Sequence, residues 1–261
     1  MTVPTTFFGW VGLLLEKYGI LFLQGTGVTL LIALTGTIIG FILGLLVAIA
    51  RTMHPRAHAT FIERILYKIL HGILSIYIEV FRGTPMMVQA MVIYYGAMQY
   101  LGWDLPTLGA AILVVSINTG AYMAEIIRGG IISVDQGQTE AAHSIGMSHW
   151  QTMIYVVLPQ AVRNIMPSIG NEFVVNIKDS SVLNVISVTE LFFASKSAAG
   201  TYYRYFETFF ITAVIYLTLT FTVTRLLRLL EKKMDGKKTY TIMGSQTDSR
   251  AAIKVPDNNK Q

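Results

Sequence analysis

Long apolar stretches separated by short polar segments dominate the chain. The clearest is residues 28–50, which carry no charge and match the roughly 20 residues that a helix needs to cross a membrane. Residues 208–224 are likewise uncharged, and residues 107–127 are apolar apart from a few polar positions that include Glu125. Residues 1–27 are only mildly apolar, so the pattern defines no span there and predicts an external segment over residues 1–23.

The stretch 62–101 allows two counts of membrane crossings. Residues 62–80 are amphipathic, whereas residues 86–101 are apolar. A kink is predicted between them at Arg82, Gly83 and Pro85. We interpret the stretch as one net crossing, made of a tilted or interfacial helix, the kink, and the crossing proper. The alternative treats both halves as spans.

Residues 161–192 are predicted to be helical but too polar to face lipid on all sides. The interrupting side chains are Arg163, Asn171, Glu172, Asn176, Lys178 and Asp179. Because polar groups are costly in lipid, we expect this segment to lie nearest a translocation path, or to be partly a loop that its neighbours bury. With this segment counted, the chain is predicted to be all-α and polytopic, with about five transmembrane helices.

Glycines and basic residues add packing and orientation to this scheme. Gly36, Gly40 and Gly44 repeat at helical spacing, which predicts a face for close packing on another helix. Basic residues follow the first span at Arg51 and the last at Arg225. By the positive-inside rule these ends are cytoplasmic, so the N-terminus is predicted outside and the C-terminus inside. Residues 233–261 are polar and predicted to be a disordered cytoplasmic tail.

Composition supports the membrane class and excludes several chemistries. Of 261 residues, 53% are hydrophobic and 13% charged, against about 25% charged in soluble domains. Cysteine is absent, which excludes disulfides and thiolate metal sites. His54 and His58 lie four apart, but Pro55 disturbs any helix there, so we expect no metal site. The net charge of +5 reflects membrane orientation, so no nucleic-acid partner is expected. No cleaved signal peptide is expected at the N-terminus.

Catalytic motifs are missing from the chain. It has no GxxxxGK[ST] phosphate loop, no HExxH and no GxSxG elbow, and its five histidines are scattered. The chain is therefore predicted to be a transporter without enzymatic activity. Its energy would come from an ion gradient or from a separate ATPase. The gradient-driven alternative usually shows two comparable halves, and no internal repeat is present.

Residues 140–159 form the longest polar-containing interruption between apolar segments. Gly146 is placed to end one short helix in the left-handed conformation. Ser148 and Gln151 have the spacing of a capping box that starts another. Pro159 is expected to stop this second helix.

Polar residues within the spans are candidates for a substrate path. Asn118, Tyr122 and Glu125 lie at positions i, i+4 and i+7, on one helix face. A carboxylate at this depth usually faces the protein interior or a water-filled path. Glu125 therefore either lines the path or pairs structurally with Arg128. Asn171, Glu172 and Lys178 are the further candidates.

The order of short motifs resembles one family. Glu140, Ala141 and Ala142, then Gly146, then Leu158 and Pro159, are similar to the EAA loop of type I ABC importer permeases. Other matches resemble its polar amino-acid branch: Arg82-Gly83-Thr84-Pro85, Gln89, Ala121-Tyr122, Arg128-Gly129-Gly130, Gly137-Gln138, Asn171-Glu172, Lys178-Asp179-Ser180-Ser181 and Thr189-Glu190-Leu191. The resemblance covers about residues 24–232. His143 and His149 depart from it, as does the tail.

The resemblance implies a function and a set of partners. Residues 24–232 would form the type I ABC transmembrane domain, with a coupling loop at about 133–160. An ABC ATPase dimer would grip that loop, so no cofactor binds this chain and ATP is used by the partner. A second permease, identical or paralogous, and an extracytoplasmic solute-binding protein would complete an importer of a polar amino acid. Such a protein lies in the cell membrane of a prokaryote.

Overall fold

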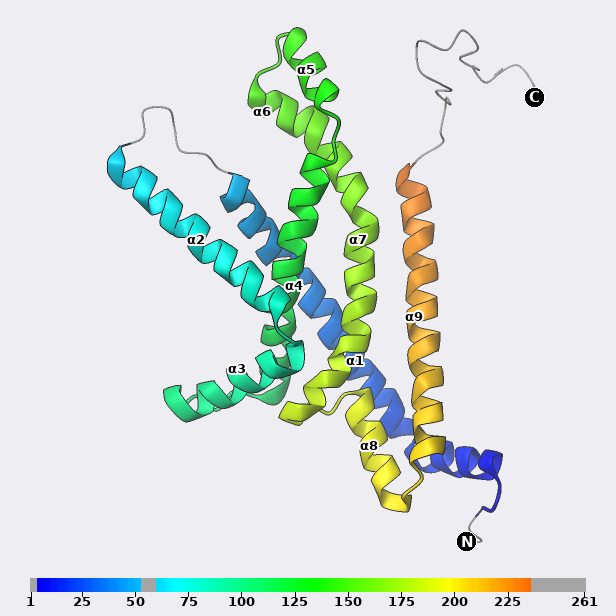
Figure 1. Cartoon of the computed structure of the whole chain (residues 1–261). Coiled ribbons are helices and arrows are strands. Elements are labelled where there is room, and N and C mark those ends of the chain that lie inside the picture. Colours follow the sequence, from blue (N-terminus) through cyan, green and yellow to red (C-terminus); the bar gives the residue numbers. More distant parts are fainter. Residues whose placement is uncertain (1–3, 53–59, 236–261) are drawn as a thin grey trace, which may run out of the picture.

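The structure is a computed structural model that describes residues 4–52 and 60–235, and its elements in these ranges are all helices (Figure 1). They are α1 (Phe7–Thr52), α2 (Phe61–Gly83), α3 (Met86–Leu101), α4 (Thr107–Ile132), α5 (Gln136–Ser144), α6 (His149–Thr152), α7 (Leu158–Asp179), α8 (Leu191–Tyr202) and α9 (Tyr205–Asp235). A π turn (Met153–Val157) joins α6 to α7, and a 3-10 helix (Ser180–Ile186) follows α7. The all-α prediction is confirmed. His54 and His58 and most of the predicted tail lie outside the described residues.

The long helices alternate in direction. Figure 1 shows α1, α4 and α9 running toward the end that carries α5 and α6, and α2 and α7 running away from it. Within the described ranges, Phe7–Arg51, Thr107–Ile132 and Tyr205–Lys233 are long and apolar enough to span a membrane. A bent pair, His149–Ile186 and Leu191–Tyr202, adds a fourth if its halves count as one span. The alternating directions are those expected of successive crossings, but this criterion gives three spans, or four with the bent pair, where the sequence predicts about five.

The two halves of the stretch 62–101 differ from expectation. The chain breaks at the expected place, because α2 ends at Gly83 and α3 begins at Met86. However, α2 is the helix that runs away from the end carrying α5 and α6, and α3 lies across the direction of α4 and α7 (Figure 1). The extended backbone of Thr84 and Pro85 causes this change of direction. The segment expected to be the crossing proper is therefore the transverse one.

Helix α1 begins well before the predicted span. Its 46 residues at 1.5 Å each measure about 69 Å, roughly twice the hydrocarbon thickness. Figure 1 shows its first turns lying across the lower end of the molecule before the helix climbs. Trp10, Leu14 and Phe22 are buried there, and Leu14 and Phe22 pack in a cluster with Leu191 of α8 and Ile211 of α9. Tertiary contacts thus define a helical segment that composition alone left unassigned.

The glycine stripe of α1 packs directly on α4, as predicted. A Cβ atom on Gly36 would collide with the side chain of Val115. On Gly40 it would lie 2.7 Å from Cβ of Thr119, and on Gly44 it would lie 2.8 Å from the backbone nitrogen of Ala124. Because only glycine leaves room for these contacts, the two backbones approach closely without an intervening side-chain layer.

A buried amide joins α7 to this pair. The Nδ2 atom of Asn176 donates to Oγ1 of Thr37 on α1 at 2.8 Å and to Oγ1 of Thr119 on α4 at 3.0 Å. All three side chains are buried. The polar residue is therefore satisfied inside the bundle and fixes α7 against α1 and α4 at one level.

Enlarging the stripe should destabilise the bundle. Gly44→Val is expected to lower the unfolding free energy by roughly 2 kcal/mol, because the added atoms meet α4 backbone that cannot move aside. Thermal unfolding in detergent measures this effect. Gly27→Val is the control, since a Cβ there has no neighbour within 4 Å. Equal melting temperatures for the two variants would contradict the packing.

Candidate functional site

The segment from α5 to the π turn projects from one end of the bundle, and we call it the knuckle (Figure 1). Asp135 caps α5 by accepting the Gly137 N–H at 2.6 Å. Gly146 then has a φ of +83°, and a Cβ on it would meet nothing within 4 Å. Glycine is therefore favoured at this position by the backbone conformation and not by a lack of space for a side chain. A capping box between Ser148 and Gln151 starts α6, as the sequence predicts.

The knuckle continues into α7 without a stop at Pro159, contrary to expectation. Pro159 lies in the first turn of α7. The π turn precedes it, with the Leu158 N–H donating to the carbonyl of Met153. The wider π geometry changes the hydrogen-bond register just before the proline, so its missing N–H does not break the helix.

The EAA residues take different positions on α5. Glu140 and Ala141 are exposed, whereas Ala142 is only 5% exposed and contacts the chain itself. Ala142 is therefore not free for close approach by a partner. The cap of α5 is Asp135, and Glu140 lies in the middle of that helix.

Large apolar side chains point outward from the knuckle. Ile145, Trp150 and Tyr155 are 78%, 73% and 72% exposed, and Ile154 is half exposed. We call these four residues the knuckle surface. Sequence reasoning missed Trp150 and Tyr155, which are hydrophobic residues in a segment otherwise marked by its polar positions. An exposed aromatic group of this kind is characteristic of an interaction site.

The knuckle is fixed firmly to α4 and α7. Val134, Val157 and Ala161 form a buried cluster beneath it. Asn164 of α7 donates to Oγ of Ser133, the residue that caps the end of α4, at 2.9 Å. Nearby, a Cβ on Gly130 would collide with Ile165, so the two helices touch. Movement of the knuckle must therefore carry the ends of α4 and α7 with it.

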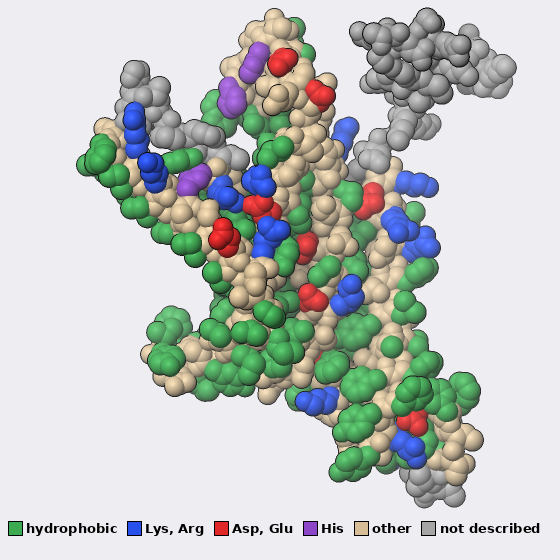
Figure 2. Space-filling model, in the orientation of Figure 1, with side chains coloured by type: hydrophobic (Ala, Val, Ile, Leu, Met, Phe, Trp, Pro, Cys, Tyr) green, Lys and Arg blue, Asp and Glu red, His purple; other side chains and the backbone are tan. Residues whose placement is uncertain are grey.

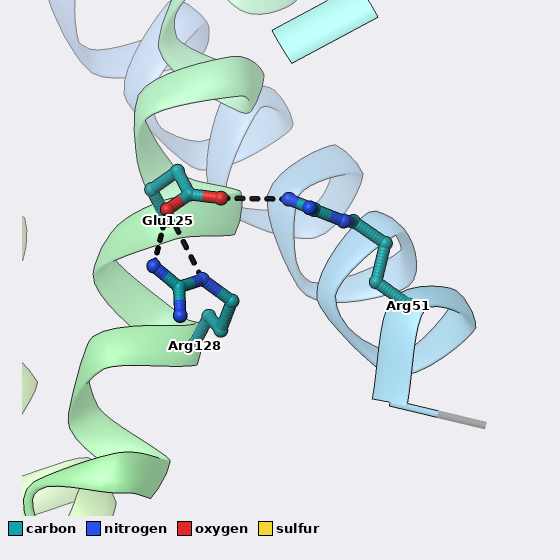
Figure 3. Close-up of polar contacts among 3 residues, drawn as sticks. All are labelled: Arg51, Glu125 and Arg128. Carbon is teal, nitrogen blue, oxygen red and sulfur yellow. Dashed lines mark hydrogen bonds and ion pairs between the residues drawn. The ribbon is translucent and has the colours of Figure 1, made fainter. Parts of the chain in front are cut away.

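Two arginines hold the carboxylate of Glu125 (Figure 3). Arg51, at the end of α1, lies 2.7 Å from Oε1, and Arg128 lies 2.8 Å from Oε2. The expected pairing with Arg128 is present, and Arg51 adds a long-range partner that sequence spacing could not indicate. Both acceptor oxygens are thus used within the chain. A path role for Glu125 stays a prediction.

The α2–α3 corner is fixed by buried amides. Asn118 of α4 donates to the carbonyl of Phe81 at 3.1 Å and to Oε1 of Gln89 at 2.9 Å. Gln89 in turn donates to the carbonyls of Phe81 and Thr84. Asn118 therefore has a structural task at the break in the chain.

The remaining path candidates lie in two places, with Tyr122 and Glu172 near Arg82 and with Asn171 and Lys178 facing α9. Arg82 is exposed and stacks over Tyr122 at 5.4 Å. Asn171 and Lys178 are exposed and line hollows of about 130 and 330 Å³ between α7 and α9. Glu172 is half-buried on the same helix. Figure 2 shows charged side chains of both signs in the middle of the visible face, among hydrophobic ones.

A helical bundle with apolar spans, charged side chains of both signs on one face and a projecting, firmly seated knuckle is typical of the membrane component of a transport system. Residues 40–236 match the family described as "Binding-protein-dependent transport system inner membrane component". The chain belongs to that family.

Relatives and solved structures agree with this assignment. The glutamine transport system permease protein GlnP of Escherichia coli (strain K12) is 36% identical over 215 residues, covering 82% of this chain and 93% of that protein. The arginine transport system permease protein ArtQ of Bacillus subtilis (strain 168) is 35% identical over 212 residues, covering 81% and 91%. The crystal structure of an amino acid ABC transporter with histidines matches with a TM-score of 0.76 at 39% identity, covering 89% and 100%. An inward-facing MetNI methionine ABC transporter, at 17% identity and a TM-score of 0.67, shares the fold.

The ion-pair cluster gives a test of whether Glu125 acts structurally. Glu125→Gln and Arg51→Ala are each expected to lower the unfolding free energy by about 1 kcal/mol, since the groups are partly exposed. The double variant should lose less than the sum of the two, because both remove the same contact. Unchanged stability together with a raised substrate KM in Glu125→Gln would instead support the path role.

Proposed function

We propose that the chain is the permease subunit of an ATP-driven importer of a polar amino acid. The knuckle carries this proposal: it is an exposed, apolar, two-helix projection that is seated rigidly on two long helices. The family membership and the amino-acid transport names of the relatives support it. The gradient-driven alternative receives no support from either.

The partner at the knuckle would be a subunit of an ABC ATPase dimer. The knuckle surface fits recognition of a short helix in a groove, in which Trp150 and Ile145 supply buried area. Exposed Glu140 and Ala141 lie beside it, and Gly146 sets the angle between α5 and α6. ATP is bound and hydrolysed by that partner, so this chain needs no cofactor for the reaction.

Closure of the ATPase dimer would move the knuckle as a rigid body. Because the knuckle is fixed to α4 and α7, this movement reaches the middle of the bundle, where Asn176 joins α7 to α1 and α4. Two permeases, identical or paralogous, would rock between outward and inward access. The α4–α7 junction beneath the knuckle thus transmits force and performs no chemistry.

The substrate path would lie along the face that carries Arg82, Tyr122 and Glu172. These side chains come from α2, α4 and α7, and they have no ion pair within 4 Å among the described residues. Groups of both signs suit a zwitterionic amino acid. Asn171 and Lys178 would contribute where α7 meets α9. Asn118 would support the path by holding the α2–α3 corner.

The orientation follows from the same scheme. By the positive-inside rule, the basic residues near the ends of α1 and α9 support a cytoplasmic position for the knuckle end in a prokaryotic cell. The N-terminal part of α1 and the α8–α9 turn would then lie outside, where an extracytoplasmic solute-binding protein delivers the substrate.

Changing the hinge glycine should uncouple transport from ATP hydrolysis. Gly146→Pro is expected to reach the membrane but to show weakened ATPase association and no uptake, because proline cannot adopt a φ of +83°. Copurification with the ATPase and ATP-dependent uptake into vesicles measure this. Gly146→Asn is the matched control, since asparagine tolerates the left-handed region and should retain most activity. Normal transport by Gly146→Pro would contradict a role of the knuckle in coupling transport to the ATPase.

Removing the exposed indole should weaken ATPase binding without harming the fold. Trp150→Ala is expected to reduce affinity for the ATPase about tenfold, in line with loss of an aromatic anchor at an interface. Trp103→Ala removes an exposed indole that lies outside the knuckle and should leave this affinity unchanged. Equal affinities for Trp150→Ala and the unmodified protein would remove Trp150 from the docking surface.

A further inference from the structure

The turn between α8 and α9 carries a strained tyrosine that is not buried. Tyr203 has a φ of +55°, a region that bulky L-residues avoid at a cost of about 1 kcal/mol or more. Its side chain is 81% exposed. No packing inside the chain therefore compensates for the strain.

The backbone of this turn does not require a tyrosine. Tyr203 ends α8 in the left-handed conformation, and its N–H and that of Arg204 both donate to the carbonyl of Ala199. Glycine makes the same cap without the strain. The reason for an aromatic residue here must lie in what its ring meets outside the chain.

The residues on either side of Tyr203 are fixed in place. Lys17 of α1 donates to the hydroxyl of Tyr202 at 2.6 Å. The guanidinium of Arg204 stacks over Trp10 at 4.5 Å. It also pairs with Glu207 of α9 at 3.6 Å. Tyr203 therefore projects from a rigid base, so little conformational entropy is lost when its ring is bound.

The turn lies at the end of the molecule opposite the knuckle (Figure 1). Tyr205 and Phe206 are 51% and 74% exposed beside it. Figure 2 shows hydrophobic side chains gathered at this lower end around acidic and basic ones. We call Tyr203, Tyr205 and Phe206 the aromatic tip.

We propose that the aromatic tip is a contact surface for the extracytoplasmic solute-binding protein, with Tyr203 as its anchor. The inference rests on the proposed function, which places this end outside. The family is described as binding-protein-dependent, so a protein partner is needed on that side. Aromatic rings also lie at lipid interfaces, but contact with a fluid headgroup layer does not depend on holding one ring in a strained, fixed direction. Binding in a protein pocket does depend on the direction of the ring, so it can compensate for the strain.

The test uses the complete importer in lipid nanodiscs. The probe is the binding protein that supports uptake by the unmodified complex, loaded with the amino acid that it carries. ATPase rate is measured as that protein is titrated. Tyr203→Gly is expected to raise the concentration for half-maximal stimulation about tenfold, while the melting temperature stays equal or rises because the strain is relieved. Tyr203→Asn, which also tolerates the backbone, should shift the curve similarly, and Tyr203→Phe should restore most of the affinity.

Tyr100→Ala is the matched control, since Tyr100 on α3 is also 81% exposed and lies outside the aromatic tip. Its titration curve should match that of the unmodified protein. An unshifted curve for Tyr203→Gly, or an equal shift for Tyr100→Ala, would overturn the assignment. Failure of the proposed function looks different, because the unmodified chain would then neither copurify with an ATPase nor respond to any binding protein.

Discussion

The close approach of α1 and α4 is the contact on which the remaining structure depends. Inside a membrane, hydrophobic burial does not favour helix association, since lipid tails are as apolar as leucine. Close van der Waals contact and internal hydrogen bonds must supply the free energy. Gly36, Gly40 and Gly44 provide the first, and the amide of Asn176 provides the second by joining α7 to the pair.

This central unit explains how a small projection could control the whole chain. Helix α4 leads into the knuckle and α7 leads out of it, and the two helices touch at Gly130 and Ile165. The Glu125 cluster fixes the end of α1 to α4 just below that point. Helices α2, α3 and α9 are attached more lightly and expose most of their surface. The chain thus consists of a firm centre and more loosely attached flanks.

Short sequence patterns correctly predicted the structural features that depend only on neighbouring residues. The left-handed Gly146, the capping box of α6 and the glycine face of α1 each follow from a few neighbouring residues. Pro159 was misjudged because a π turn, which has no clear sequence signature, removes its effect on the helix. The partner Arg51 of Glu125 and the bridge through Asn176 were not foreseen. Each joins residues that are far apart in the chain, so the spacing of residues along the sequence could not indicate the contact.

The central claim is that the knuckle and the bundle move as one body when ATP binds. Pulsed electron-electron spin-label distances test it directly, because the chain contains no cysteine and single labels can be placed without background. Labels at exposed Ala141 and at Leu113 of α4 report on rigidity within one chain, and labels at Ala141 of two neighbouring permeases report on rocking. We expect the first distance to stay constant and the second to change between the nucleotide-free and ATP-bound complexes. A change in the first distance with a constant second one would contradict the account.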